Sequence, residues 1–126
     1  MEEAEKFLKI KRRLADIYRE NLSGISGLEL PIEEDYARRL YWHYEVRLKD
    51  RNKLADVLAN NGVETRKFFV PMHQQPGCKR QGMFAGEKYP VAEKLSKRGL
   101  CLPSGLALKE SEVVYICGII KRFMKE

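Results

Sequence analysis

Cysteine and histidine are scarce in this 126-residue sequence, and their spacing argues against the sites that they most often build. The cysteines, Cys78, Cys101 and Cys117, are odd in number, and no two of them have CxxC spacing. His43 and His73 are the only histidines. The sequence therefore indicates neither a disulfide framework nor a zinc site, and a reducing compartment fits it best.

Long apolar runs and catalytic signatures are also missing. No apolar run approaches the roughly 20 residues that a membrane-spanning helix needs, and the acidic start Met1–Glu5 lacks the apolar region of a signal peptide. We therefore expect a cytoplasmic protein without a membrane partner. The sequence has no GxGxxG or P-loop pattern. Neither histidine has a serine or cysteine at the spacing of a nucleophile–base pair.

The excess positive charge lies in the middle third of the chain. The net charge is +6, and residues 66–98 contain eight basic and two acidic side chains, which accounts for all of it. The remaining residues have sixteen charges of each sign and are balanced. A local positive field favours an anionic partner such as phosphate, a nucleotide or nucleic acid. A solvated, lysine-rich surface would have the same composition.

The hydrophobic pattern predicts a single small α+β domain with a three-stranded sheet and flanking helices. Apolar residues at helical spacing predict helices over 2–22, 51–60, 90–98 and 110–124. Alternating or β-branched residues predict strands over 42–48, 64–70 and 100–103. In chain order, the first strand, the second helix and the second strand form a βαβ-like unit. A long loop, 71–88, separates that unit from the third helix.

The segment Thr65–Pro76 is the most distinctive stretch. Pro71 ends the predicted strand because proline lacks a backbone donor. Pro76 follows five residues later, so we expect a rigid turn and not a helix between them. That turn presents His73 and Gln75 at the end of a strand, which is a common way to build a binding site. An ordinary surface loop would have the same pattern.

Four stretches, in order, resemble the C-terminal domain of the DegT/StrS family of PLP-dependent sugar aminotransferases, and perosamine-synthetase-like members in particular. They are residues 11–18, 62–76, 89–93 and 100–106, and they extend over most of the chain. Two positions depart from the family pattern. Phe69 stands where many members have tyrosine, and Gly77–Cys78 replaces an aromatic pair.

The resemblance implies a fold like the C-terminal domain of fold-type I PLP transferases. Residues 1–24 would be a linker helix and residues 25–126 the small domain, with the large PLP-binding domain absent. The parent enzyme would use PLP to transfer an amino group from glutamate to a 4-keto nucleotide sugar, in perosamine and polysaccharide biosynthesis. In this family the PLP lysine and the aspartate on the ring nitrogen lie in the large domain. We read the Ser104–Lys109 spacing, which is similar to that around the PLP lysine, as coincidence.

We therefore expect that the chain alone contains no catalytic residue, binds no PLP and is inactive. The sequence by itself leaves open whether the chain is an enzyme. With a large domain present, His73, Arg66 and Gln75 would contact the nucleotide sugar. Two alternatives remain open. One is a non-catalytic module that associates with itself or with a full-length aminotransferase. The other is a basic nucleic-acid-binding domain, which the lack of RNP1 or GxxG segments disfavours.

Overall fold

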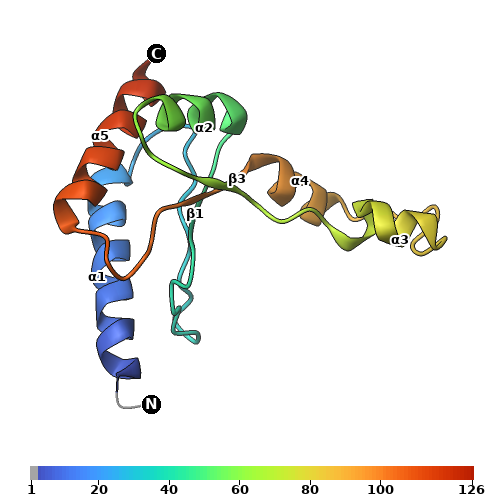
Figure 1. Ribbon diagram of the computed structural model, residues 1–126, viewed down its shortest axis with the longest axis horizontal. Helices are drawn as coiled ribbons and strands as arrows, with labels where there is room; N and C mark the ends of the chain where they lie inside the picture. The colour runs from blue at the N-terminus through green and yellow to red at the C-terminus, as the bar shows by residue number, and fades with distance from the viewer. Residues whose placement is uncertain (1–2) are drawn as a thin grey trace.

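The structure is a computed structural model that describes residues 3–126 (Figure 1). Within that range it has five α-helices, one short 3-10 helix and a three-stranded antiparallel sheet, which confirms the predicted α+β class. In chain order the elements are α1 (Ala4–Leu22), β1 (Tyr44–Arg47), α2 (Arg51–Asn60), β2 (Arg66–Lys67), η1 (Met72–Gln74), α3 (Pro76–Arg80), α4 (Pro90–Arg98), β3 (Gly99–Leu102) and α5 (Glu110–Lys125).

The sheet has the order β1–β3–β2, with the last strand in the chain at its centre. Tyr44 lies opposite Leu102 in one pair, and Arg66 lies opposite Cys101 in the other. Both outer strands run antiparallel to β3, so β1 and β2 are parallel to each other with β3 between them. The predicted βαβ-like unit is present, but its two strands do not pair directly.

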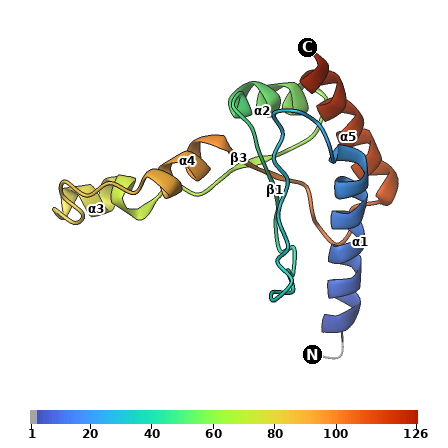
Figure 2. The same cartoon turned by 180° about the vertical axis from the view of Figure 1, so that it is seen from behind.

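One face of the sheet forms the core together with α1, α2 and α5. Tyr44, Val46, Leu100 and Leu102 point into this core, where they are at most 3% exposed. The helices α1 and α5 lie side by side over it (Figures 1 and 2). Tyr18 of α1 stacks on Tyr44, with ring centroids 4.7 Å apart. Burying these apolar groups is the main favourable contribution to folding.

The predicted apolar stripe of the first helix is confirmed only in its second half. Leu14, Ile17, Tyr18 and Leu22 are buried, whereas Phe7 is 41% exposed. The N-terminal turns of α1 therefore extend past the part of the core that this chain supplies. Position 2, where the predicted helix begins, lies outside the described residues.

The first two predicted strands are shorter than expected, and the second ends early because β3 begins only at Gly99. Lys67 pairs with Leu100, and the last ladder bond runs from the Phe68 N–H to the Gly99 carbonyl at 3.1 Å. Before Gly99 the chain is helical, so residues 68–70 have no strand to pair with. The first strand begins only at Tyr44, which pairs with Leu102 at the end of β3. Just before it, Tyr41 has a positive φ of 52°, and Trp42 is 72% exposed.

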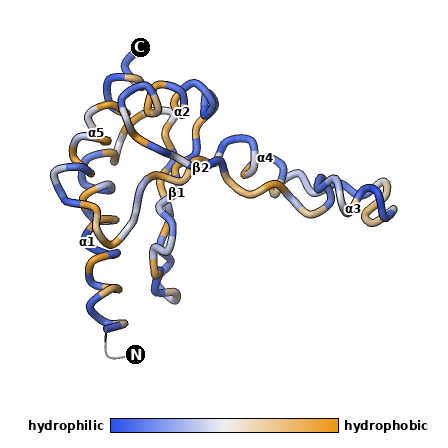
Figure 3. Tube along the Cα trace, in the orientation of Figure 1, coloured by the Kyte–Doolittle hydropathy of each residue, from blue (hydrophilic) through white to orange (hydrophobic). Residues whose placement is uncertain are grey.

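Residues 68–98, which we call the arm, extend away from the remaining chain, which we call the body (Figures 1 and 2). The prediction that the segment between Pro71 and Pro76 contains no helix is wrong, because the short 3-10 helix η1 spans Met72–Gln74. The predicted loop 71–88 also contains a helix, α3, which begins at Pro76. Pro71 directly precedes η1 and Pro76 is the first residue of α3, and proline is well tolerated at the start of a helix. Figure 3 shows apolar stretches continuing from the body into the arm.

No helix within residues 3–126 combines the length and the apolar character needed to cross a bilayer.

Candidate functional site

Arg66, one of the predicted site residues, lies at the outer edge of the sheet. It is exposed on β2 and borders an open hollow of about 570 Å³. The hollow is also bordered by residues 62–65, by residues 101–104 and by the first half of α5. Glu64 and Glu112 also border the hollow, so its charge is mixed. The guanidinium of Arg66 is its main cationic group.

His43 contributes to the wall of the same hollow, although its place on a polar strand face predicts a solvent-side residue. It is half-buried, and its ring lies 4.3 Å from the Trp42 ring between centroids. Its Nε2 atom is buried and has no hydrogen-bond partner among the described residues. Such an atom is costly to bury, so this position differs from an ordinary exposed histidine.

His73 lies on the arm and is held by a carboxylate that the sequence pattern did not single out. Its Nε2 atom lies 2.8 Å from Oε1 of Glu93 in α4, and its side chain is 8% exposed. The backbone N–H of Tyr89 donates to the same oxygen at 3.3 Å. The Tyr89 ring lies 4.9 Å from the His73 ring between centroids. The hydrogen bond from His73, and then that from Tyr89, lowers the pKa of Glu93.

The Glu93 contact fixes how His73 can bind another group. An ionised carboxylate only accepts hydrogen bonds, so the proton of this contact is on Nε2. In the neutral ring Nδ1 is then an acceptor, which suits a hydroxyl donor. The two residues are twenty positions apart, so only the fold of the arm brings them together.

Gln75, the third predicted site residue, uses its amide group locally. Its Nε2 donates to the carbonyl of Val70 at 3.0 Å, which closes the turn around η1. Gln75 also occupies the N-cap position of α3. The three predicted residues do not meet in one pocket. Arg66 borders the hollow on the body, while His73 borders a separate one of about 350 Å³ on the arm.

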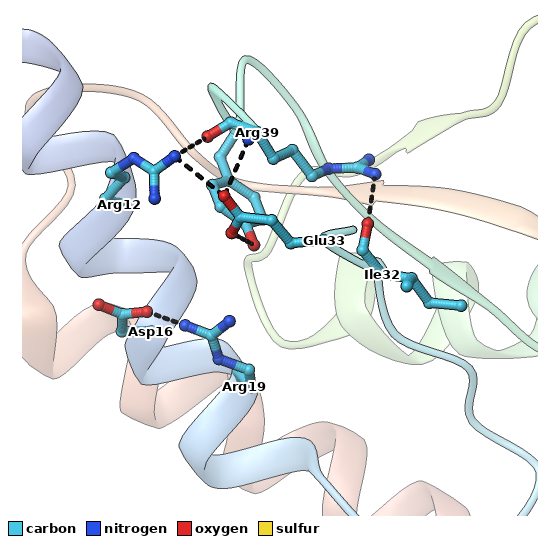
Figure 4. Close-up of polar contacts among 7 residues, drawn as sticks. Arg12, Asp16, Arg19, Ile32, Glu33 and Arg39 are labelled. Atoms are coloured by element: carbon cyan, nitrogen blue, oxygen red, sulfur yellow. Dashed lines mark hydrogen bonds and ion pairs between the residues drawn. The ribbon is translucent and has the colours of Figure 1, made fainter. Parts of the chain in front are cut away.

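A polar network joins the segment 31–41 to α1 (Figure 4). Glu33 accepts hydrogen bonds from Arg12 Nη2 at 3.0 Å, from the Arg39 backbone N–H at 2.9 Å and from the Tyr41 hydroxyl at 3.0 Å. Arg12 also donates to the Arg39 carbonyl at 2.7 Å. The backbone N–H of Arg39, followed by Arg12 and Tyr41, lowers the pKa of Glu33 to about 2. This network holds the segment that leads into β1.

The residues around Lys109 do not fit a PLP site. Lys109 is the N-cap residue of α5, and its backbone N–H donates to Glu112 at 2.7 Å. Glu110 and Glu112 occupy the first turn of that helix. PLP needs a covalent lysine, a partner for the ring nitrogen and donors for its phosphate. Two carboxylates beside the lysine would repel a phosphate, which supports reading the Ser104–Lys109 spacing as coincidence.

The fold of this chain matches about a third of several aminotransferases of known structure. The chain aligns with aminotransferase TlmJ from Streptoalloteichus hindustanus at a TM-score of 0.86 and 26% identity, over 98% of this chain and 33% of that one. It aligns with a DegT DnrJ EryC1 StrS aminotransferase from Brucella abortus at a TM-score of 0.80 and 26% identity, over 94% and 31%.

The sequence comparisons identify the family. The model of the DegT/DnrJ/EryC1/StrS aminotransferase family matches residues 1–121, and the chain belongs to this family. It is 32% identical to the GDP-perosamine synthase of Escherichia coli O157:H7, over all of this chain and 34% of that protein. It is 31% identical to the GDP-perosamine synthase of Vibrio cholerae, over 98% and 34%. The chain thus spans about a third of the length of these relatives, and the family resemblance is confirmed.

Proposed function

We propose that this chain is the small C-terminal domain of a PLP-dependent nucleotide-sugar aminotransferase. Residues 1–24 would form the helix between the domains, and residues 25–126 the small domain itself. The observation that supports this most is the family match over residues 1–121, combined with relatives that are about three times as long. The parent would transfer an amino group from glutamate to a 4-keto nucleotide sugar, in the cytoplasm and in polysaccharide biosynthesis.

The chain alone would not catalyse amino transfer. Its one lysine at the spacing seen around the PLP lysine, Lys109, is the N-cap residue of α5 and is followed closely by Glu110 and Glu112. A spectrum of the purified chain tests this directly. After PLP is added and free cofactor removed, we expect no visible absorbance and no lysine adduct after borohydride reduction. A single reduced adduct at Lys109 would contradict the proposal.

In the complete enzyme, Arg66, His73 and Gln75 would face the nucleotide sugar. A guanidinium suits a diphosphate because its fork of donors matches the phosphate oxygens. His73, with Nε2 bound to Glu93, would accept a hydrogen bond from a sugar hydroxyl through Nδ1. The positive charge of residues 66–98 would support binding of the diphosphate.

Joining this chain to the large domain of a GDP-perosamine synthase, in place of that enzyme's own C-terminal third, allows the site residues to be tested. Arg66→Ala should raise the KM for the nucleotide sugar about tenfold or more, since a hydrogen bond to a charged group contributes ~1.5–3 kcal/mol. His73→Ala should raise it about two- to tenfold, since a hydrogen bond between neutral groups contributes ~0.5–1.5 kcal/mol. Lys67→Ala removes one positive charge of the same region from the next position of β2, so it measures the effect of charge alone and should raise KM less than Arg66→Ala. If KM and kcat are unchanged in both variants, the assignment of the site is wrong.

A second candidate function is association with another protein, either a second copy of this chain or a full-length aminotransferase. The arm exposes apolar side chains that a monomer would leave in water, namely Phe69, Val70, Met72, Met83 and Val91. Exposed apolar surface of this kind often marks an interface. Sedimentation at increasing concentration should reveal a dimer, and a monomer at high concentration would count against self-association.

A further inference from the structure

The arm leaves the body and returns to it at a single place, which we call the arm root. The root consists of Phe68, where the outgoing chain leaves β2, and residues 96–99, where α4 ends and β3 begins. The returning chain has no loop, because Gly99 follows the last residue of α4 directly. The direction of the arm therefore depends on how the end of α4 is held.

The free carbonyls at the end of α4 are bound by groups of the body. A helix leaves its last carbonyls without partners of its own. Here the Arg51 side chain donates through Nη1 to the carbonyls of Ser96 at 3.2 Å and Gly99 at 2.8 Å. The Leu48 N–H donates to the Arg98 carbonyl at 3.1 Å. A cation near a helix C-terminus is also favoured by the helix dipole.

Arg51 is itself held firmly. It is the first residue of α2, and it is 9% exposed. Its Nε donates to the side-chain oxygen of Asn52 at 2.8 Å, which orients the guanidinium toward α4. One buried side chain on the body thus bonds to two successive parts of the returning chain, the last turn of α4 and the first residue of β3.

The outgoing chain is packed against the same point. The Phe68 N–H donates to the Gly99 carbonyl at 3.1 Å, the carbonyl that also accepts from Arg51. A Cβ atom at position 99 would lie 2.6 Å from the Phe68 Cβ and 2.8 Å from the Leu95 carbonyl oxygen. Glycine is therefore what lets the two chains of the arm approach so closely.

We propose that Arg51 is a positioning residue that sets the direction in which the arm leaves the body. It acts through the end of α4, and it thereby places His73 and the exposed apolar side chains of the arm. The proposal goes beyond the proposed function, because it concerns the geometry of this chain whatever the arm binds.

The distance between two nitroxide labels tests this proposal. One label is placed at Lys79→Cys in α3, in a Cys78→Ser background, and the other at Glu20→Cys in α1; both positions are exposed. Cys101 and Cys117 are buried, and burial raises the pKa of both thiols, so they should not react. Arg51→Met keeps the length of the side chain and removes its donors. We expect a broader distance distribution with a shifted mean.

Val113→Ala is the matched control, because it truncates a fully buried side chain of α5 far along the chain from the root. It should lower the melting temperature and leave the distance distribution unchanged. The proposal would be overturned if the distance distribution of Arg51→Met were the same as that of the starting protein. It would also be overturned if Val113→Ala broadened the distribution as much as Arg51→Met does. If Arg51→Met does not fold, Arg51→Gln is read in the same way. Neither result depends on a nucleotide sugar, so this test is separate from that of the proposed function.

Discussion

At the scale of single residues, Glu33 has a strongly lowered pKa. The hydrogen bonds that lower it could not be predicted from the sequence alone. The acidic run Glu33–Asp35 looks like an ordinary polar turn. In the structure Glu33 accepts hydrogen bonds from Arg12, from the Arg39 backbone and from Tyr41. These donors lie on a helix and on the far side of the turn, so no spacing rule links them. Glu93, the partner of His73, was missed for the same reason.

Glu33 should make stability depend on pH. Its pKa is about 2 in the folded protein, against 4.5 for an ordinary glutamate. A lowered pKa means that the stabilisation is fully present above about pH 4.5 and is lost as the pH falls toward 2. Glu33→Gln should therefore lower Tm at pH 7, and the difference from the starting protein should shrink as the pH is lowered through this window. An equal difference at pH 7 and pH 2 would contradict the assigned role.

Tyr18 gives a second prediction at this scale. It is fully buried, and its hydroxyl donates to the Pro103 carbonyl at 2.7 Å. Tyr18→Phe keeps the ring stacking but leaves that carbonyl without this donor, so it should cost about 1 kcal/mol of unfolding free energy. Tyr36→Phe, at an 89% exposed position, is the control and should change nothing. Equal denaturation midpoints for the two variants would show that the hydrogen bond contributes nothing measurable.

At the scale of elements, hydrophobic periodicity predicts whether a helix or strand exists better than it predicts how long that element is. The helices over 51–60, 90–98 and 110–124 and the strand over 100–103 agree with the structure within a residue or two, because each buries an apolar face that the sequence displays. The strand over 64–70 is reduced to Arg66–Lys67 because its partner becomes helical before Gly99. Only the pairing, and not the β-branched and aromatic composition, decides where such a strand ends.

Two glycines should respond to alanine with opposite signs. At Gly99 a Cβ would lie 2.6 Å from Phe68, so Gly99→Ala should destabilise by about 1–3 kcal/mol through overpacking. Gly118 lies within α5 with nothing within 4 Å of its added Cβ. Gly118→Ala should stabilise by ~0.5–1 kcal/mol, because alanine is the better helix former. Urea denaturation of both variants measures the difference, and a stabilising Gly99→Ala would contradict the packing described at the arm root.

At the scale of the whole molecule, the body has a continuous core and the arm does not. The buried side chains of the core all belong to the body, while the arm exposes Phe69, Val70, Met72 and Val91. The sequence places the excess positive charge in residues 66–98, but it could not show that residues 68–98 project from the body while Arg66 and Lys67 stay in the sheet. Arg66 and His73 consequently border different hollows, although they are only seven positions apart.

This division predicts uneven hydrogen exchange. Regions with few buried apolar contacts open with low free energy. In the isolated chain, the amides of residues 71–88 should exchange faster than those of α5 and β3. When the chain is joined to a large domain, protection should appear in the arm if that domain covers it. Arm amides as slow as those of α5 in the isolated chain would contradict the picture of an arm without a partner.

The most direct test of the central claim is the rate of amino transfer from glutamate to a 4-keto nucleotide sugar. It is measured for the isolated chain with PLP and for this chain joined to the large domain of a GDP-perosamine synthase. We predict transfer by the joined enzyme and none by the isolated chain. A joined enzyme that folds and binds PLP but transfers no amino group would contradict the account, as would transfer by the isolated chain.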